Sequence, residues 1–218
     1  IAILYPAVHF SRFGLRVMLF VPVSTLCVWL FWSAVNELLE DSQEANLKSK
    51  IVNRKLILSG FLLGLGIYTY AAARLFPLLF MLFVPLWFWW QPAARRLWKS
   101  IGLMAGVSVI TAVPLLWFFA RYPYFFLFRI AYVAENGAGV VAGNRWLTWL
   151  YNAGRVLRAF IWQGEPRFRH NLPGRPFLDA IQLGFTTVGL GLTLRKPNPR
   201  LLFLWLWLLI MLLPSVLS

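Results

Sequence analysis

Long runs without a charged residue dominate this sequence. A helix needs about 20 apolar residues to cross the hydrocarbon core of a bilayer, and helices satisfy their own backbone groups where no water is present. The runs that approach this length are residues 17–36, 56–73, 75–94, 100–120, 180–194 and 201–218. The sequence therefore predicts an all-α, polytopic membrane helix bundle with about six transmembrane segments, of which 180–194 is short.

The composition supports a membrane rather than a soluble chain. Charged residues make up 13% of it, against about 25% in a typical soluble domain. A net charge of +14 would suggest a nucleic-acid partner in a soluble protein. Here most basic residues flank the apolar runs, so we interpret them as topology signals and contacts with lipid phosphates, with the bilayer as partner and no nucleic acid.

The sequence carries no visible metal or cofactor signature. Its single cysteine, Cys27, lies in an apolar run and is expected to be a small packing residue. No Cys/His cluster and no acidic metal-binding pair is visible, so no cofactor is evident, and the use of a divalent metal stays open.

The chain begins at Ile1 and ends at Ser218, directly after an apolar run. We interpret residues 1–218 as one transmembrane domain and as a fragment of a larger protein.

The distribution of basic residues predicts the orientation. If the segments alternate, the connections 37–55, 91–99 and 195–200 share one side and carry all five lysines and most of the arginines of the short connections. The opposite side has Arg12, Arg16 and Arg74 in its short connections, and eight arginines but no lysine in the loop 121–179. The positive-inside rule makes the first side cytoplasmic and 121–179 a long external loop. Because arginine suits phosphate better than lysine, the external side is expected to bind an anion.

Residues 145–163 place apolar side chains at helical spacing with arginines mostly on other faces. This pattern predicts an amphipathic, non-spanning helix in the external loop, which either lies along the bilayer surface or packs on the external face of the bundle.

Donor side chains gather in the Pro- and Gly-rich stretch QGEPRFRHNLPGRPFLD, residues 163–179. We interpret this stretch as part of a substrate site, with a plain loop scaffold as the alternative. Asp179 would also start the next helix, where the helix dipole stabilises a carboxylate. The candidate ligands here are Arg167, Arg169, His170, Asn171, Arg175 and Asp179.

Arg74 is the only charge between two apolar runs, so it is expected at the tip of a tight helical hairpin, close after Tyr68 and Tyr70. An ionisable residue between membrane segments is costly unless it is used, which favours a functional role over an interface marker. Arg12 and Arg16 are four apart and share one face of a helix, where they would bind a phosphate or simply reach lipid headgroups.

Four stretches resemble bacterial GT-C type membrane glycosyltransferases, the group related to protein mannosyltransferases (glycosyltransferase family 39) and to the aminoarabinose transferases of lipid A. They are HFSRFGLR (9–16), GFLLGLGIYTYAAARLFP (60–77), RHNLPGRPFLD (169–179) and LLIMLLPSVLS (208–218). The third is the most specific. The resemblance covers the middle of such a protein and lacks the first external loop, where the family carries its acidic catalytic base, so the catalytic residue is unknown here.

The resemblance implies transfer of a sugar from a polyprenyl-phosphate donor to a glycan, lipid or protein acceptor outside a bacterial inner membrane. Arg74, with Tyr70 nearby, Arg12 and Arg16 would hold the donor phosphate, and the residues around Arg169 and Arg175 would close over it. A polysaccharide ligase or polymerase, a lipid or sugar transporter, and a structural membrane subunit are the alternatives.

Overall fold

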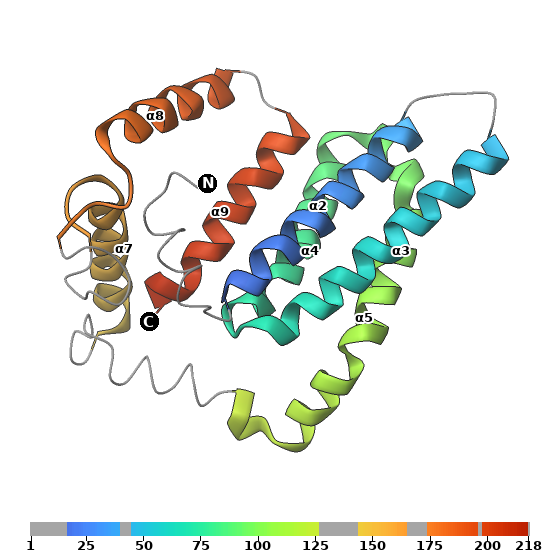
Figure 1. Ribbon diagram of the computed structural model, residues 1–218, viewed down its shortest axis with the longest axis horizontal. Helices are drawn as coiled ribbons and strands as arrows, with labels where there is room; N and C mark the ends of the chain where they lie inside the picture. The colour runs from blue at the N-terminus through green and yellow to red at the C-terminus, as the bar shows by residue number, and fades with distance from the viewer. Residues whose placement is uncertain (1–16, 40–44, 127–143, 165–173, 196–197, 218) are drawn as a thin grey trace. The chain divides into compact units, whose positions relative to one another are not determined.

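The computed structural model describes residues 17–39, 45–126, 144–164, 174–195 and 198–217 (Figure 1). All regular structure in this part of the chain is helical, which confirms the predicted all-α class. The chain divides into two compact units. One comprises Arg16–Tyr122, and the other comprises Pro123–Ser218 with Ile1–Leu15.

The first unit contains four long helices and two short 3₁₀ turns. The long helices are α2 (Val17–Leu39), α3 (Ala45–Thr69), α4 (Phe76–Trp90) and α5 (Trp98–Arg121), and the turns are η1 (Ala72–Leu75) and η2 (Pro92–Leu97). Helix α3 lies between α2 and α5 and contacts both (Figure 1). Prolines lie inside α2, α4 and α5, as membrane helices tolerate when neighbours restore the lost hydrogen bonds.

Aromatic rings fill the contact between α2 and α4. Phe31 meets Phe80 edge to face with ring centroids 5.3 Å apart, and Phe20 meets Phe76 at 5.2 Å. These side chains are almost completely buried. Edge-to-face pairs of this kind add to the packing energy beyond the area that they bury, so they fix α4 against α2.

A small polar cluster joins α2 to α3. The Ser59 hydroxyl donates to the Cys27 carbonyl oxygen at 2.9 Å, and the Cys27 thiol lies 3.3 Å from the Ser59 carbonyl oxygen. Both side chains are fully buried. Cys27 is therefore a packing residue, as predicted, and its small side chain lets the two backbones approach.

Glycines bring α3 against α5. A Cβ atom added at Gly64 would lie 2.6 Å from the Ser108 carbonyl oxygen, and one added at Gly60 would overlap the Met104 carbonyl oxygen. The G-x-x-x-G spacing of Gly60 and Gly64 on α3 thus permits a close contact between the two helices. The second such pair, Gly102 and Gly106 on α5, has no described atom within 4 Å of an added Cβ.

The second unit contains α7 (Arg145–Ile161), α8 (Ala180–Arg195) and α9 (Pro199–Leu217). Helix α7 packs on α9, where the Asn152 side-chain amide donates to the Val216 carbonyl oxygen at 3.3 Å. This bond satisfies one of the last carbonyls of α9, which have no partner inside their own helix.

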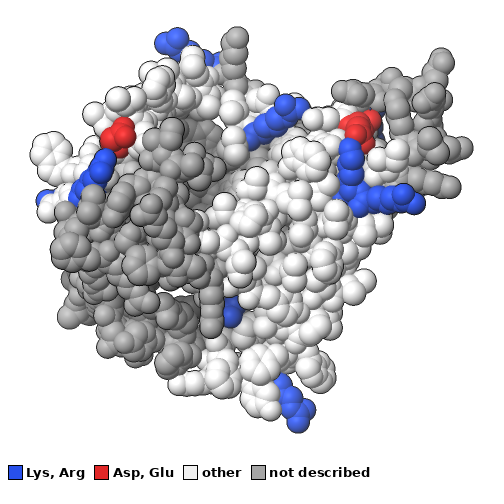
Figure 2. Space-filling view, in the orientation of Figure 1, with Lys and Arg blue, Asp and Glu red and all other residues white. Residues whose placement is uncertain are grey.

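Within the described residues, five helices are long and apolar enough to cross a membrane: Met18–Leu39, Ile51–Thr69, Ala72–Trp90, Pro92–Arg121 and Pro199–Leu217. Many large apolar side chains on their surfaces are exposed, and Figure 2 shows a broad area of the first unit with few charged side chains. The chain is therefore a multi-pass membrane protein. The apolar part of α8, Ala180–Thr193, is shorter than these five, so the predicted sixth span is not established.

Candidate functional site

The hairpin between α3 and α4 is built as the sequence predicts. Helix α3 ends at Thr69, η1 follows, and α4 begins at Phe76 with Pro77 in its first turn. Backbone hydrogen bonds from Ala73 to the Tyr70 carbonyl oxygen and from Arg74 to the Ala71 carbonyl oxygen close the turn. Arg74 lies in this turn, at the end of two apolar helices.

The Arg74 guanidinium lies over the ring of Phe119, with 4.5 Å between its central carbon and the ring centroid. A cation over an aromatic face is attracted by the ring, and the attraction grows where water is scarce. Arg74 is half-buried, and Phe119 comes from the last turns of α5. The contact therefore holds the cation where the hairpin and the end of α5 meet.

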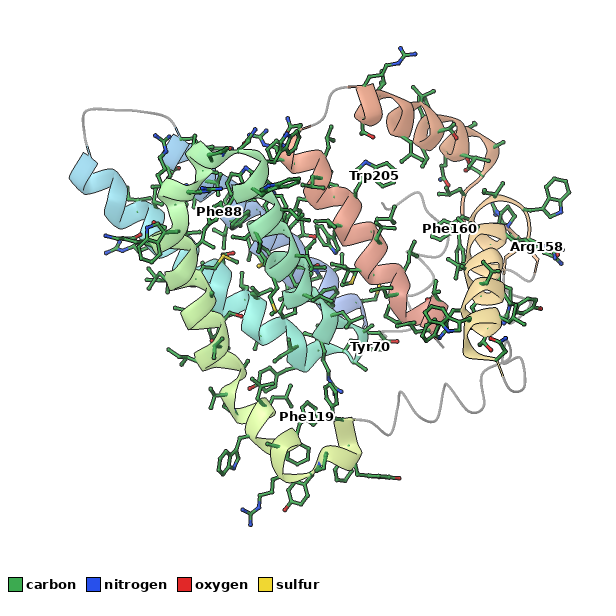
Figure 3. The ribbon with its side chains drawn as sticks, turned by 180° about the vertical axis from the view of Figure 1, so that it is seen from behind. Tyr70, Phe88, Phe119, Arg158, Phe160 and Trp205 are labelled. Atoms are coloured by element: carbon green, nitrogen blue, oxygen red, sulfur yellow. The ribbon has the colours of Figure 1, made fainter. Side chains whose placement is uncertain are left out.

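The two tyrosines near Arg74 differ in role. The Tyr68 hydroxyl donates to the Thr111 carbonyl oxygen at 2.9 Å, so this side chain ties α3 to α5. The Tyr70 side chain is 41% exposed. Figure 3 shows Tyr70 and Phe119 toward the same end of the unit, so an exposed phenol and the cation–ring pair share this end.

Phe119 and Thr111 belong to this site but are missed by reasoning from sequence. They are more than 40 residues from Arg74 and Tyr68, and no motif links them. The only signal for Phe119 is its place in an aromatic cluster just before Arg121, at the end of an apolar run.

The other described candidates, Arg175 and Asp179, lie in the second unit. Asp179 begins α8, as predicted. Its carboxylate accepts from the Gln182 backbone N–H at 2.8 Å, and the Gln182 side-chain oxygen accepts from the Asp179 N–H at 3.2 Å. This reciprocal pair is a capping box, in which each side chain satisfies a free donor of the helix start.

The segment before Asp179 is anchored on α7. The Phe177 and Leu178 N–H groups donate to the carbonyl oxygens of Ala159 and Phe160, at 2.9 and 3.3 Å. The rings of Phe160 and Phe177 lie 5.6 Å apart, and Figure 3 shows Phe160 on α7. Gly174 has φ +75°, a conformation that favours glycine. Arg175 is exposed between this turn and the anchored segment.

Helix α7 has three faces. Thr148 and Asn152 are buried, and Asn152 contacts α9. Trp146, Leu150 and Leu157 form an exposed apolar stripe. Arg155 and Arg158 point to a third face, where Arg158 donates to the Gln163 side-chain oxygen at 2.6 Å. The predicted amphipathic helix is confirmed, and it both packs on a neighbour and keeps an apolar stripe that fits a membrane interface.

The structure thus brings Tyr70 and Arg74 together in one unit, and Arg175 and Asp179 in the other. The remaining candidates lie outside the described residues: Arg12, Arg16, Arg167, Arg169, His170 and Asn171. No group of three or more His, Cys, Asp or Glu side chains that could hold a metal occurs among the described residues.

Comparisons of the chain with protein-family models, with curated proteins and with solved structures found no match.

The capping box separates two roles of Asp179. Replacing Asp179 with alanine removes the cap and is expected to cost about 1 kcal/mol of stability, whereas asparagine caps a helix equally well. Asp179→Asn should therefore keep the thermal midpoint of the wild type. If Asp179→Asn loses activity at full stability, the carboxylate serves the substrate. If only Asp179→Ala is affected, and only in its thermal midpoint, Asp179 is a cap alone.

Proposed function

We propose that this chain is part of a membrane glycosyltransferase that moves a sugar from a polyprenyl-phosphate donor to an acceptor on the external face. The observation that carries this proposal is the placement of Arg74. The guanidinium is half-buried at the end of an apolar hairpin and is held over the Phe119 ring. A lipid-linked phosphate reaches a protein at this depth, with its chain in the bilayer and its charge at the surface.

The proposed reaction explains the need for a fixed cation. The bond between the anomeric carbon of the sugar and the phosphate oxygen breaks, and the bonding electrons stay on the phosphate. The acceptor oxygen forms the new bond to the anomeric carbon and loses its proton to a base. The phosphate changes from a singly charged diester to a monoester with more negative charge, which a fixed guanidinium stabilises more strongly than the starting diester.

Other parts of the chain have supporting roles in this proposal. Tyr70 is exposed near the Arg74 turn and would donate to the phosphate or to a sugar hydroxyl. Arg12 and Arg16 would bind the same phosphate or a neighbouring headgroup. In the second unit, α8 would insert in the bilayer as a sixth segment and α7 would lie at its surface. We assign the base to no residue of this chain.

The proposal is tested with the parent protein, reconstituted in liposomes and supplied with labelled polyprenyl-phosphate sugars. We expect release of polyprenyl phosphate and transfer of the label to an acceptor. Movement of intact donor across the bilayer without cleavage would identify a transporter. Consumption of polyprenyl-diphosphate glycans alone would identify a ligase or polymerase. Either result, in folded protein, would overturn the proposal.

A further inference from the structure

The turn η2 follows the C-terminal end of α4, whereas Arg74 precedes the N-terminal end of the same helix. The two turns therefore lie at opposite ends of α4. Helix α4 ends at Trp90, η2 covers Pro92–Leu97, and α5 begins at Trp98. Ala94 and Leu97 are buried and anchor the turn, whereas Arg95, Arg96 and Lys99 are exposed. Three cations thus follow one another on a short, anchored segment between two apolar helices.

Hydrogen bonds fix two of these cations. Arg95 donates through Nε to the Phe88 carbonyl oxygen at 3.1 Å, near the C-terminal end of α4. Arg96 donates through Nη2 to the carbonyl oxygens of Leu38 and Leu39, both at 3.3 Å, at the C-terminal end of α2. Cations are favourable at helix C-termini, where carbonyls lack partners. Each guanidinium has further N–H groups beyond those in these bonds.

Acidic residues do not balance this turn. Residues 37–55, which connect α2 to α3, contain four acidic and four basic residues and are neutral overall. Lys55 of this stretch forms an ion pair with Glu37 and donates to the Ser33 hydroxyl of α2 at 2.8 Å. From Ala45 to Ala134 the sequence contains no Asp or Glu. The three positive charges of residues 91–99 are therefore a true surplus at this end.

Tryptophans place this turn at the level of lipid headgroups. Trp89 and Trp98, on either side of η2, are 79% and 63% exposed. The Lys99 ammonium lies 5.8 Å from the centroid of the Trp98 ring. Exposed tryptophans gather where the hydrocarbon core meets the headgroups, so the neighbouring cations lie at the depth of the lipid phosphates.

We propose that η2 and the first turn of α5 bind the headgroup of an anionic phospholipid in the leaflet that this end faces. Arg95, Arg96 and Lys99 contact the phosphate, and Trp89 and Trp98 lie against the upper acyl chains. This site is separate from the proposed catalytic function, since Arg74 lies at the opposite ends of α3 and α4. Loss of one site leaves the other measurable.

The test compares the binding of an anionic and a zwitterionic phospholipid to the parent protein in neutral detergent. Binding is measured by native mass spectrometry and by thermal unfolding. The probes are phosphatidylglycerol and phosphatidylcholine with matched acyl chains. Each basic residue near an anionic surface contributes about 1 kcal/mol, so three together predict about a 100-fold preference for phosphatidylglycerol. The triple variant Arg95→Gln, Arg96→Gln, Lys99→Gln should lose most of this preference. The control Arg121→Gln, which is compared with Lys99→Gln below, removes one charge from the opposite end of α5 and should keep the preference.

A single substitution keeps the test decisive if the triple variant folds poorly. Lys99→Gln leaves the contacts of Arg95 and Arg96 with the helix ends intact and should lower the preference about fivefold. Equal binding of the two lipids by the wild type would overturn the proposal. So would an equal loss in the matched control, or displacement of the lipid by millimolar inorganic phosphate, which would show a site for free anions.

Discussion

Replacing Arg74 with alanine is expected to lower kcat/KM of the parent protein for a polyprenyl-phosphate donor by about 100-fold or more. Removal of one fixed group that stabilises developing charge typically has an effect of this size. The physical reason is the position of the guanidinium, which lies half-buried over the Phe119 ring, where its attraction for an anion is stronger than in bulk water.

Two further variants distinguish charge from geometry. Arg74→Lys keeps the charge but loses the planar fork that binds two phosphate oxygens, so we expect an intermediate loss. Phe119→Leu keeps the cation but removes the ring that holds it, and should reduce kcat/KM severalfold with little change in folding. Arg121→Ala removes an exposed arginine from the end of the same α5 helix and should act like the wild type. If Arg74→Ala turns over the donor normally, Arg74 only marks the membrane interface.

The second large effect is expected at the contact between α3 and α5. In Gly64→Ala the new methyl group would lie 2.6 Å from both the Ser108 carbonyl oxygen and the Thr111 Cβ atom, so one helix must move. Overpacking of this kind costs about 1–3 kcal/mol. The double variant Gly60→Ala, Gly64→Ala should cost more, because the Met104 backbone also blocks a methyl group at position 60.

Gly106→Ala is the matched control for Gly64→Ala. It makes the same chemical change in an apolar helix but meets no described atom within 4 Å. Because alanine favours a helix over glycine, its thermal midpoint should equal or exceed that of the wild type. Thermal unfolding in detergent should therefore separate the two variants. Equal midpoints for Gly64→Ala and Gly106→Ala would show that α3 and α5 are not in close contact.

Much of the fold follows from the sequence because lipid imposes one solution on a long apolar run. The hairpin around Arg74, the packing role of Cys27 and the start of α8 at Asp179 are local consequences of charge placement, side-chain size and capping. The number of spans does not follow from the sequence in the same way. The apolar stretch of α8 lies between Asp179 and Arg195 and is too short for its length alone to decide whether it crosses.

The candidate site is harder to predict, since its contacts join helices that are distant in sequence. Nothing near Arg74 indicates that Phe119 of α5 supports it. Sequence spacing also treats the G-x-x-x-G pairs of α3 and α5 alike, although among the described residues Gly60 and Gly64 meet a neighbouring backbone and Gly102 and Gly106 do not. Similarly, the basic residues of 91–99 indicate an orientation, but not that Arg95 and Arg96 bind the ends of α4 and α2.

The proposed function requires that the first unit crosses the bilayer with the Arg74 end outside and η2 in the cytoplasm. Single cysteines at Ala93 and Arg121, both exposed positions, test it in a Cys27→Ala background with a membrane-impermeant maleimide. Ala93 lies just before α5 and Arg121 is its last residue. Helix α5 has 24 residues and is therefore about 36 Å long. We expect labelling of Arg121→Cys only in right-side-out vesicles and of Ala93→Cys only in inside-out vesicles. Labelling of both from one side, or the reverse pattern, would contradict it.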